Sequence, residues 1–145
     1  GYLKLLVWRL RPATHNLGGL WSSQTRNWLK KPGKLLLGFP NYAYDWTLPY
    51  VRGESVAPSL STVEAVALAL ERGAEIQFDE QAASPYFYYT DENGREHVVW
   101  FEDARSYQEK VNLIKEYSLA GGFIWDLMRR NPQGFVTLNA LLDVE

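Results

Sequence analysis

Residues that could bind a sugar are concentrated in one stretch, residues 34–46 (KLLLGFPNYAYDW). An apolar run there gives way to Tyr42, Tyr44, Asp45 and Trp46. Flat rings with a few hydrogen-bonding groups suit the faces and hydroxyls of carbohydrates. The alternative is an aromatic corner of the core, and the segment alone favours neither interpretation. For Asp45, a ligand-binding role and a structural role are likewise favoured equally.

Carboxylates that could act as acid or base occur in two adjacent pairs, Asp79-Glu80 and Glu102-Asp103, each at the end of a predicted strand. Neighbours in a strand face opposite ways, so neither pair by itself forms a two-carboxylate site. Structural roles are favoured for all four residues, and Asp103 suits the start of the following helix.

Metal and cofactor sites have no support in the sequence. His15 and His97 are too far apart for a local metal motif, and the chain has no cysteine. No phosphate-binding loop, dinucleotide fingerprint or Gly-x-Ser-x-Gly motif occurs. We therefore expect no bound metal and no cofactor.

Two apolar runs are predicted to be the strands that position the aromatic residues. Residues 35–37 are consecutive leucines, as in a strand covered on both faces, and residues 119–125 (LAGGFIW) form a second buried strand with two glycines for close packing. Trp125 ends this second strand, where parallel α/β folds place ligands. A lone Trp would favour the core, but together with Tyr42 and Tyr44 it could form the floor and wall of one site.

The middle of the chain is predicted to be a helix and a small antiparallel sheet. Ser61 and Glu64 have capping-box spacing for a helix that Gly73 ends. Its expected apolar face is Val63, Val66, Ala67 and Leu70. A loop is expected at residues 51–59 and strands at 75–79, 86–90 and 97–101, the last two joined by a turn through Asn93-Gly94.

Two helices are expected in the last third of the chain. The first begins near Ser106, where Ser106 and Glu109 repeat the capping-box spacing, and buries Tyr107, Val111, Ile114 and Tyr117. The second follows Pro132 and carries Phe135, Leu138, Leu141 and Leu142. Residues 1–33 predict little: residues 2–8 could be a strand or a fragment of a buried helix, and residues 22–31 a short helix.

Composition excludes several classes of protein. The chain has 145 residues, of which 46% are hydrophobic, so it can bury the core of one domain. A net charge of -2 with scattered Lys and Arg argues against a nucleic-acid partner. No apolar run is long enough to span a membrane, and the N-terminus shows no signal-peptide pattern.

Three separated segments resemble one known family. They are residues 34–50 (KLLLGFPNYAYDWTLPY), residues 73–106 (GAEIQFDEQAASPYFYYTDENGREHVVWFEDARS) and residues 119–133 (LAGGFIWDLMRRNPQ). In order and spacing they closely resemble the C-terminal part of glycoside hydrolase family 18, in its bacterial branch of spore-germination and cortex-lytic N-acetylglucosaminidases. The resemblance covers about residues 34–145.

The resemblance implies an α/β fold: the C-terminal portion of a (β/α)₈ barrel, with strands resembling seven and eight, and an α+β insertion lobe. Residues 34–50 and 104–145 would be the partial barrel, 51–103 the lobe, and 1–33 a poorly matched segment near strand six. By the same resemblance, Trp125 would lie under the sugar at the cleavage subsite, and Tyr42, Tyr44 and Asp45 would line the cleft. Trp46 and Trp100 are weaker candidates for the cleft wall or for packing of the lobe.

The resemblance implies a glycan hydrolase of which part of the barrel, including the catalytic motif, does not occur in this sequence. A whole barrel needs about 250 residues, and the family's catalytic Asp-x-x-Asp-x-Glu does not occur in residues 1–145. We expect a protein that acts on N-acetylglucosamine-containing polymers, peptidoglycan or chitin, at the cell envelope or spore, and that is inactive alone. A non-catalytic carbohydrate-binding module and an interaction domain, completed by self-association or by the missing N-terminal half of the barrel, remain alternatives.

Overall fold

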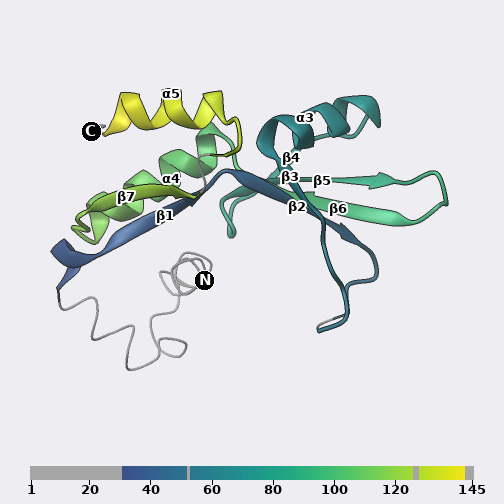
Figure 1. The fold of residues 1–145 in the computed structure, drawn as a ribbon, viewed down its shortest axis with the longest axis horizontal. Helices are drawn as coiled ribbons and strands as arrows, with labels where there is room; N and C mark the ends of the chain where they lie inside the picture. Colours follow the sequence, from purple (N-terminus) through teal and green to yellow (C-terminus); the bar gives the residue numbers. More distant parts are fainter. Residues whose placement is uncertain (1–30, 52, 126–127, 143–145) are drawn as a thin grey trace.

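The protein is described here by a computed structural model that covers residues 31–51, 53–125 and 128–142. The strand or helix fragment expected at residues 2–8 and nearly all of the helix expected at 22–31 lie outside these residues. Figure 1 shows a small sheet with two helices beside a larger sheet with one helix, so the expected mixed α/β class is confirmed. No helix in the described part of the chain is both long and apolar enough to cross a bilayer.

The smaller sheet consists of two parallel strands. β1 (Leu36–Pro40) pairs with β7 (Gly121–Trp125), with Leu36 opposite Gly121 and Pro40 opposite Trp125. One face of the sheet carries Leu37 and Phe39 into a core formed with α4 (Ala104–Glu116) and α5 (Pro132–Leu141). Both predicted strands are confirmed, although they begin one and two residues later than expected.

Within the described part of the chain, the other face of this sheet carries partly exposed side chains, which corrects the expectation that both strands are buried on both sides. Leu36 is 45% exposed, Phe123 36% and Trp125 57%. Three consecutive leucines therefore do not mark a doubly covered strand here. A strand turns alternate side chains to opposite faces, and among the described residues one face is packed and the other partly exposed. The prediction of close packing at the glycines is confirmed, since a Cβ on Gly122 would overlap the ring of Phe39.

Helix α4 begins at Ala104, two residues earlier than Ser106. Asp103 is its N-cap: the carboxylate accepts the backbone N–H of Ser106 at 3.0 Å, and the Ser106 hydroxyl accepts the backbone N–H of Asp103 at 2.9 Å. The capping role predicted for Asp103 is confirmed, whereas Ser106 is the third helical residue rather than the cap. The buried face is the predicted one, with Tyr107, Val111 and Ile114 in the core.

The larger sheet is antiparallel, with strand order β3-β2-β6-β5-β4. Its strands are β2 (Tyr42–Thr47), β3 (Ser59–Ser61), β4 (Gln77–Asp79), β5 (Ser84–Thr90) and β6 (Glu96–Trp100), and a 3-10 turn, η1 (Pro32–Lys34), precedes β1. The predicted hairpin between β5 and β6 is confirmed, but only Gly94 of the Asn-Gly pair takes a positive φ, at 77°. Residues 42–47, expected as a lip after a strand end, are themselves a strand that continues from β1 with only Asn41 between.

Helix α3 (Thr62–Glu71) covers one face of this larger sheet, with the predicted capping box of Ser61 and Glu64 present. Its predicted buried face is wrong. Val63, Val66 and Leu70 are exposed, and Thr62, Ala65 and Ala69 are buried instead. The small side chains of Ala65 and Ala69 let the helix lie close to the sheet, where Ala43 is fully buried beneath it.

Candidate functional site

Six aromatic side chains lie on the face of the larger sheet that α3 does not cover. We call this set the aromatic face: Tyr42, Tyr44, Trp46, Tyr86, Tyr88 and Trp100. The register places Tyr44 and Tyr86 on either side of Trp100. Because side chains directly opposite in a sheet share a face, all three point the same way. The intervening residues Phe87 and Val99 face α3 and form its core contacts.

The rings of the aromatic face touch one another in two rows. Along β2 and its continuation, the centroid of Tyr44 lies 5.3 Å from Tyr42 and 6.1 Å from Trp46, and Trp46 lies 5.3 Å from Tyr50. Across the hairpin, Tyr86 stacks on Trp100 at 4.6 Å. Tyr44 remains 38% exposed and Tyr88 55%. Rings fixed by their neighbours and open on one side form a ready surface for the apolar faces of sugars.

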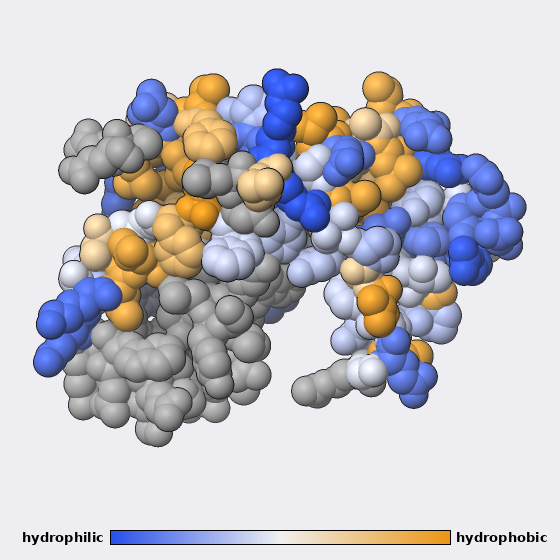
Figure 2. Space-filling view, in the orientation of Figure 1, coloured by the Kyte–Doolittle hydropathy of each residue, from blue (hydrophilic) through white to orange (hydrophobic). Residues whose placement is uncertain are grey.

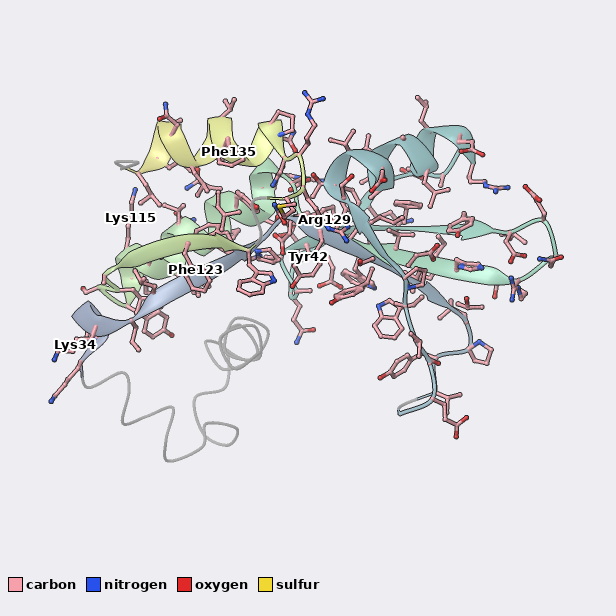
Figure 3. All side chains as sticks on the ribbon, viewed as in Figure 1. Lys34, Tyr42, Lys115, Phe123, Arg129 and Phe135 are labelled. Carbon is pink, nitrogen blue, oxygen red and sulfur yellow. The ribbon has the colours of Figure 1, made fainter. Side chains whose placement is uncertain are left out.

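Trp125 lies where the two sheets join. It ends β7 opposite Pro40, and its carbonyl oxygen accepts the backbone N–H of Asn41 at 3.1 Å, one residue before Tyr42. Its side chain is 57% exposed. The structure therefore brings Trp125 and the aromatic face to adjoining strand ends, with Tyr42 at the boundary (Figure 3).

Asp45 is not part of that surface. Its side chain points to the helix-covered face, where its two carboxylate oxygens lie 2.6 Å from the Tyr89 hydroxyl and 2.9 Å from Nδ1 of His97. Burial and the hydrogen bond to Asp45 raise the pKa of the Tyr89 phenol. Nε2 of His97 lies 3.3 Å from the carboxylate of Asp91. This arrangement ties β2 to the β5–β6 hairpin and gives Asp45 a structural role in positioning its neighbours Tyr44 and Trp46.

Asn131, which the sequence did not mark, connects the two parts of the molecule. Its Nδ2 donates to the Tyr107 hydroxyl at 2.8 Å, while its Oδ1 accepts from the backbone N–H of Gly134 at 3.0 Å and from Thr62 Oγ1 at 3.3 Å. The Tyr107 hydroxyl donates in turn to the carbonyl of Pro40 at 2.9 Å. One buried amide thus joins α3, α4 and α5 and holds the end of β1 beside Trp125.

The predicted carboxylate pairs have structural partners. Asp79 accepts the backbone N–H of Ala82 at 2.6 Å, and Glu102 forms a buried ion pair with Lys110, whose Nζ lies 2.8 and 2.7 Å from its two oxygens. Burial, followed by the charge of Glu102, raises the pKa of Tyr107. Among the described residues, no group of three or more His, Cys, Asp or Glu is placed to hold a metal ion.

A family model described as "Glycosyl hydrolases family 18" matches residues 12–129. The chain belongs to glycoside hydrolase family 18. It is 45% identical over 111 residues to the cortical fragment-lytic enzyme of Bacillus subtilis (strain 168). The matched region covers 77% of this chain and 26% of that relative. The relationship foreseen from the three sequence segments is therefore confirmed.

Two solved structures have a similar fold over the part that matches this chain. The spore cortex-lytic enzyme SleL of Bacillus cereus superposes with a TM-score of 0.74 at 41% identity, over 79% of this chain and 26% of SleL. The C-terminal domain of a putative chitinase from Desulfitobacterium hafniense DCB-2 superposes with a TM-score of 0.69 at 28% identity. This match covers 85% of the present chain and 40% of the chitinase chain. This family 18 chain thus spans about a quarter of the length of its cortex-lytic relatives.

The sequence of this family 18 chain predicts four members of the aromatic face as site residues and does not mark Tyr86 and Tyr88. Their pattern was visible, because residues 86 and 88 alternate with Phe87 and Tyr89 in a predicted strand. The sequence does not show which of the two sets faces outward, because Tyr86 and Tyr88 are aromatic and so are Phe87 and Tyr89. That face is decided by pairing with β6 and by α3.

Proposed function

We propose that this chain forms one wall of a glycan-binding cleft in a family 18 hydrolase that acts on N-acetylglucosamine-containing polymers of the cell wall or spore, peptidoglycan above all. The observation that carries the proposal is the position of exposed Trp125 at the carboxyl end of β7, next to the aromatic face. In parallel α/β folds this edge of the sheet is where ligands bind. Its relatives include an enzyme named for cleaving cortical fragments.

In this proposal β1 and β7 are neighbouring strands, seven and eight, of a (β/α)₈ barrel, residues 51–103 are its insertion lobe, and residues 34–50 with 104–145 are the partial barrel. Tyr42, Tyr44, Trp46 and Trp100 bind the glycan along the lobe, and Trp125 lies beneath one sugar ring. Asp45 acts indirectly, by fixing the strand that carries Tyr44. The acid that protonates the leaving group belongs to the Asp-x-x-Asp-x-Glu segment, which is absent from residues 1–145, so the chain alone binds but does not cleave.

Calorimetric titration of the chain with N-acetylglucosamine oligomers tests this proposal. Wild type should bind, and Trp125→Ala should weaken binding roughly tenfold, as expected from the loss of one ring face. Trp125→Phe, which retains a ring, should lose less. Phe135→Ala is a matched control, because Phe135 is a 45%-exposed aromatic residue on α5, away from Phe123 and Tyr42 (Figure 3).

Two outcomes would overturn the proposal. Equal affinities for wild type and Trp125→Ala would remove the site, and sugar release abolished by a substitution within residues 1–145 would show that the chain carries its own catalytic group. Binding without turnover is expected, and it would leave a purely carbohydrate-binding module as the alternative. Addition in trans of the remaining barrel of a cortex-lytic relative separates the two, since only a hydrolase fragment should then regain turnover.

An interaction domain is the second candidate, favoured by the partly exposed face of the β1–β7 sheet. Leu36 and Phe123 are partly exposed there, and apolar side chains on a partly exposed sheet face favour association with another chain or segment. Figure 2 shows hydrophobic side chains on the visible surface of this part of the molecule. Analytical ultracentrifugation checks it: a stable monomer at high concentration would exclude self-association.

A further inference from the structure

A cavity with two arginines lies at the junction of the two sheets. Its volume is about 620 Å³, and its walls come from the β3–α3 junction on one side and the β7–α5 connection on the other. Arg129 and Arg130 line it together with Ser59, Ser61 and Glu64. The proposed sugar site at Trp125 and the aromatic face gives none of these cavity residues a role.

Arg129 is held in a defined position at both ends. Its carbonyl oxygen accepts the side-chain amide of Asn41 at 3.2 Å, and Asn41 is fully buried beside the carboxyl end of β1. Its Nη2 donates to Ser59 Oγ at 2.8 Å. A guanidinium has five N–H donors in a planar fork, so one bond to a serine orients the group and does not exhaust it.

The bond to Ser59 also relates the arginine to the aromatic face. Ser59 pairs directly with Tyr44 in the sheet, and residues directly opposite place their side chains on the same face. The guanidinium, bonded to Ser59, therefore lies at the edge of the aromatic face on the strand that pairs with Tyr44; Figure 3 labels Arg129 and Tyr42. A group projecting from a sugar ring on that face would meet a fixed positive charge.

Among the described residues that line the cavity, one carries an opposing charge, and it is already engaged. The carboxylate of Glu64 accepts the backbone N–H of Ser61 at 2.6 Å as part of the α3 capping box. The pKa of Glu64 is lowered mainly by its backbone hydrogen bond with Ser61, with a smaller contribution from the charge of Arg129. Within the described lining, two arginines against one carboxylate give a net positive charge, and a planar arginine fork matches a carboxylate in shape.

We propose that Arg129, assisted by Arg130, recognises a carboxylate carried by the glycan, and so gives the cleft a preference for acidic over neutral N-acetylglucosamine polymers. This inference rests on the proposed function, since the sugar must first lie on the aromatic face. The carboxylate has two possible sources with the same chemistry: a lactyl ether on an alternate sugar, or a peptide attached to that sugar. Chitin has neither, so this contact selects against it.

The test is calorimetric titration of the whole chain at low salt with three glycans of equal length. One is a neutral N-acetylglucosamine oligomer, one bears free lactyl carboxylates on alternate sugars, and one bears peptides through those carboxylates. Wild type should bind one or both acidic glycans about fivefold more tightly than the neutral oligomer, the size expected for a partly exposed ion pair. The preference should shrink as salt is added.

Substitutions then test whether Arg129 is the source of the preference for acidic over neutral glycans. Arg129→Gln should bring the ratio of acidic to neutral affinity close to one, and Arg129→Lys should give an intermediate ratio, because lysine keeps the charge without the fork. Arg105→Gln is the matched control: it removes the same charge from α4, where Arg105 pairs with Asp103 at 2.8 Å and stands over Phe78. It should leave the ratio unchanged.

The outcomes separate this inference from the proposed function. If the neutral oligomer binds but wild type shows no preference, or if Arg129→Gln keeps a salt-sensitive preference, the inference is overturned and the aromatic site stands. If no glycan binds, the proposed function fails and this inference fails with it. Preference for the lactyl form or for the peptide form alone would identify which carboxylate Arg129 contacts.

Discussion

Replacing Asn131 by alanine should loosen the junction on which the site depends. The side chain is only 5% exposed and contacts α3 through Thr62, α4 through Tyr107 and α5 through the backbone of Gly134. Alanine removes all three hydrogen bonds at once. It also leaves the N–H of Gly134 buried without its cap.

The cost can be worked from these contacts. Loss of an N-cap costs about 1 kcal/mol, and each of the two remaining buried hydrogen bonds contributes about 1 kcal/mol, so Asn131→Ala should lower the free energy of unfolding by about 3 kcal/mol. Thr62→Val is the matched variant. It removes only the hydrogen bond from Thr62 Oγ1 to Asn131 and keeps both the cap of Gly134 and the donor to Tyr107, so it should cost about 1 kcal/mol.

Urea unfolding of the wild type and of both variants, followed by circular dichroism and by Trp fluorescence, gives the two differences. Equal losses for Asn131→Ala and Thr62→Val would refute the role given to Asn131, and so would a loss below about 0.5 kcal/mol for Asn131→Ala, which is typical of an unimportant surface position. Glycan titration of Asn131→Ala should also show weaker binding. The Tyr107 hydroxyl that Asn131 orients holds Pro40, the partner of Trp125.

Three further changes test other parts of the structure. Gly122→Ala should destabilise the protein by about 2 kcal/mol in urea unfolding, because its Cβ would overlap the ring of Phe39 in the core; a neutral result would contradict the packing of β7. Lys110→Met should cost about 3 kcal/mol by leaving the carboxylate of Glu102 buried and unpaired, and adding Glu102→Leu should restore most of the loss. Hydrogen bonds, chiefly one from a backbone N–H, hold the pKa of Asp91 well below its ordinary 3.8. The stability advantage of wild type over Asp91→Asn should therefore be present above about pH 5 and decline as the pH falls through 4, and a constant difference across a pH series of melting curves would contradict it.

Local chemistry made much of the fold predictable. The capping box of Ser61 and Glu64, the turn at Gly94 and the first-turn Pro132 each act over a few residues, and all three occur where the sequence placed them. The start of α4 was misplaced because two overlapping capping patterns compete, and Asp103 takes the N-cap with Ser106 as its reciprocal partner. The helix faces were less predictable: the buried side of α3 follows small residues rather than large ones, and Ala65 and Ala69 pack against Ala43, Phe87 and Val99 of the sheet.

By itself the sequence determined the family and the two aromatic segments that contain Tyr42 and Trp125, because residue identities and their spacing are sufficient for both. Only the tertiary structure decided what those residues form together. Strand pairing turned Asp45 inward and Tyr44 outward, joined the hairpin to complete the aromatic face, and placed Arg129 against Ser59, 70 positions earlier in the chain. The physical reason is that the face to which a side chain points, and its distant partners, are fixed by strand register and by the helix that covers the sheet, and neither is encoded in any single segment.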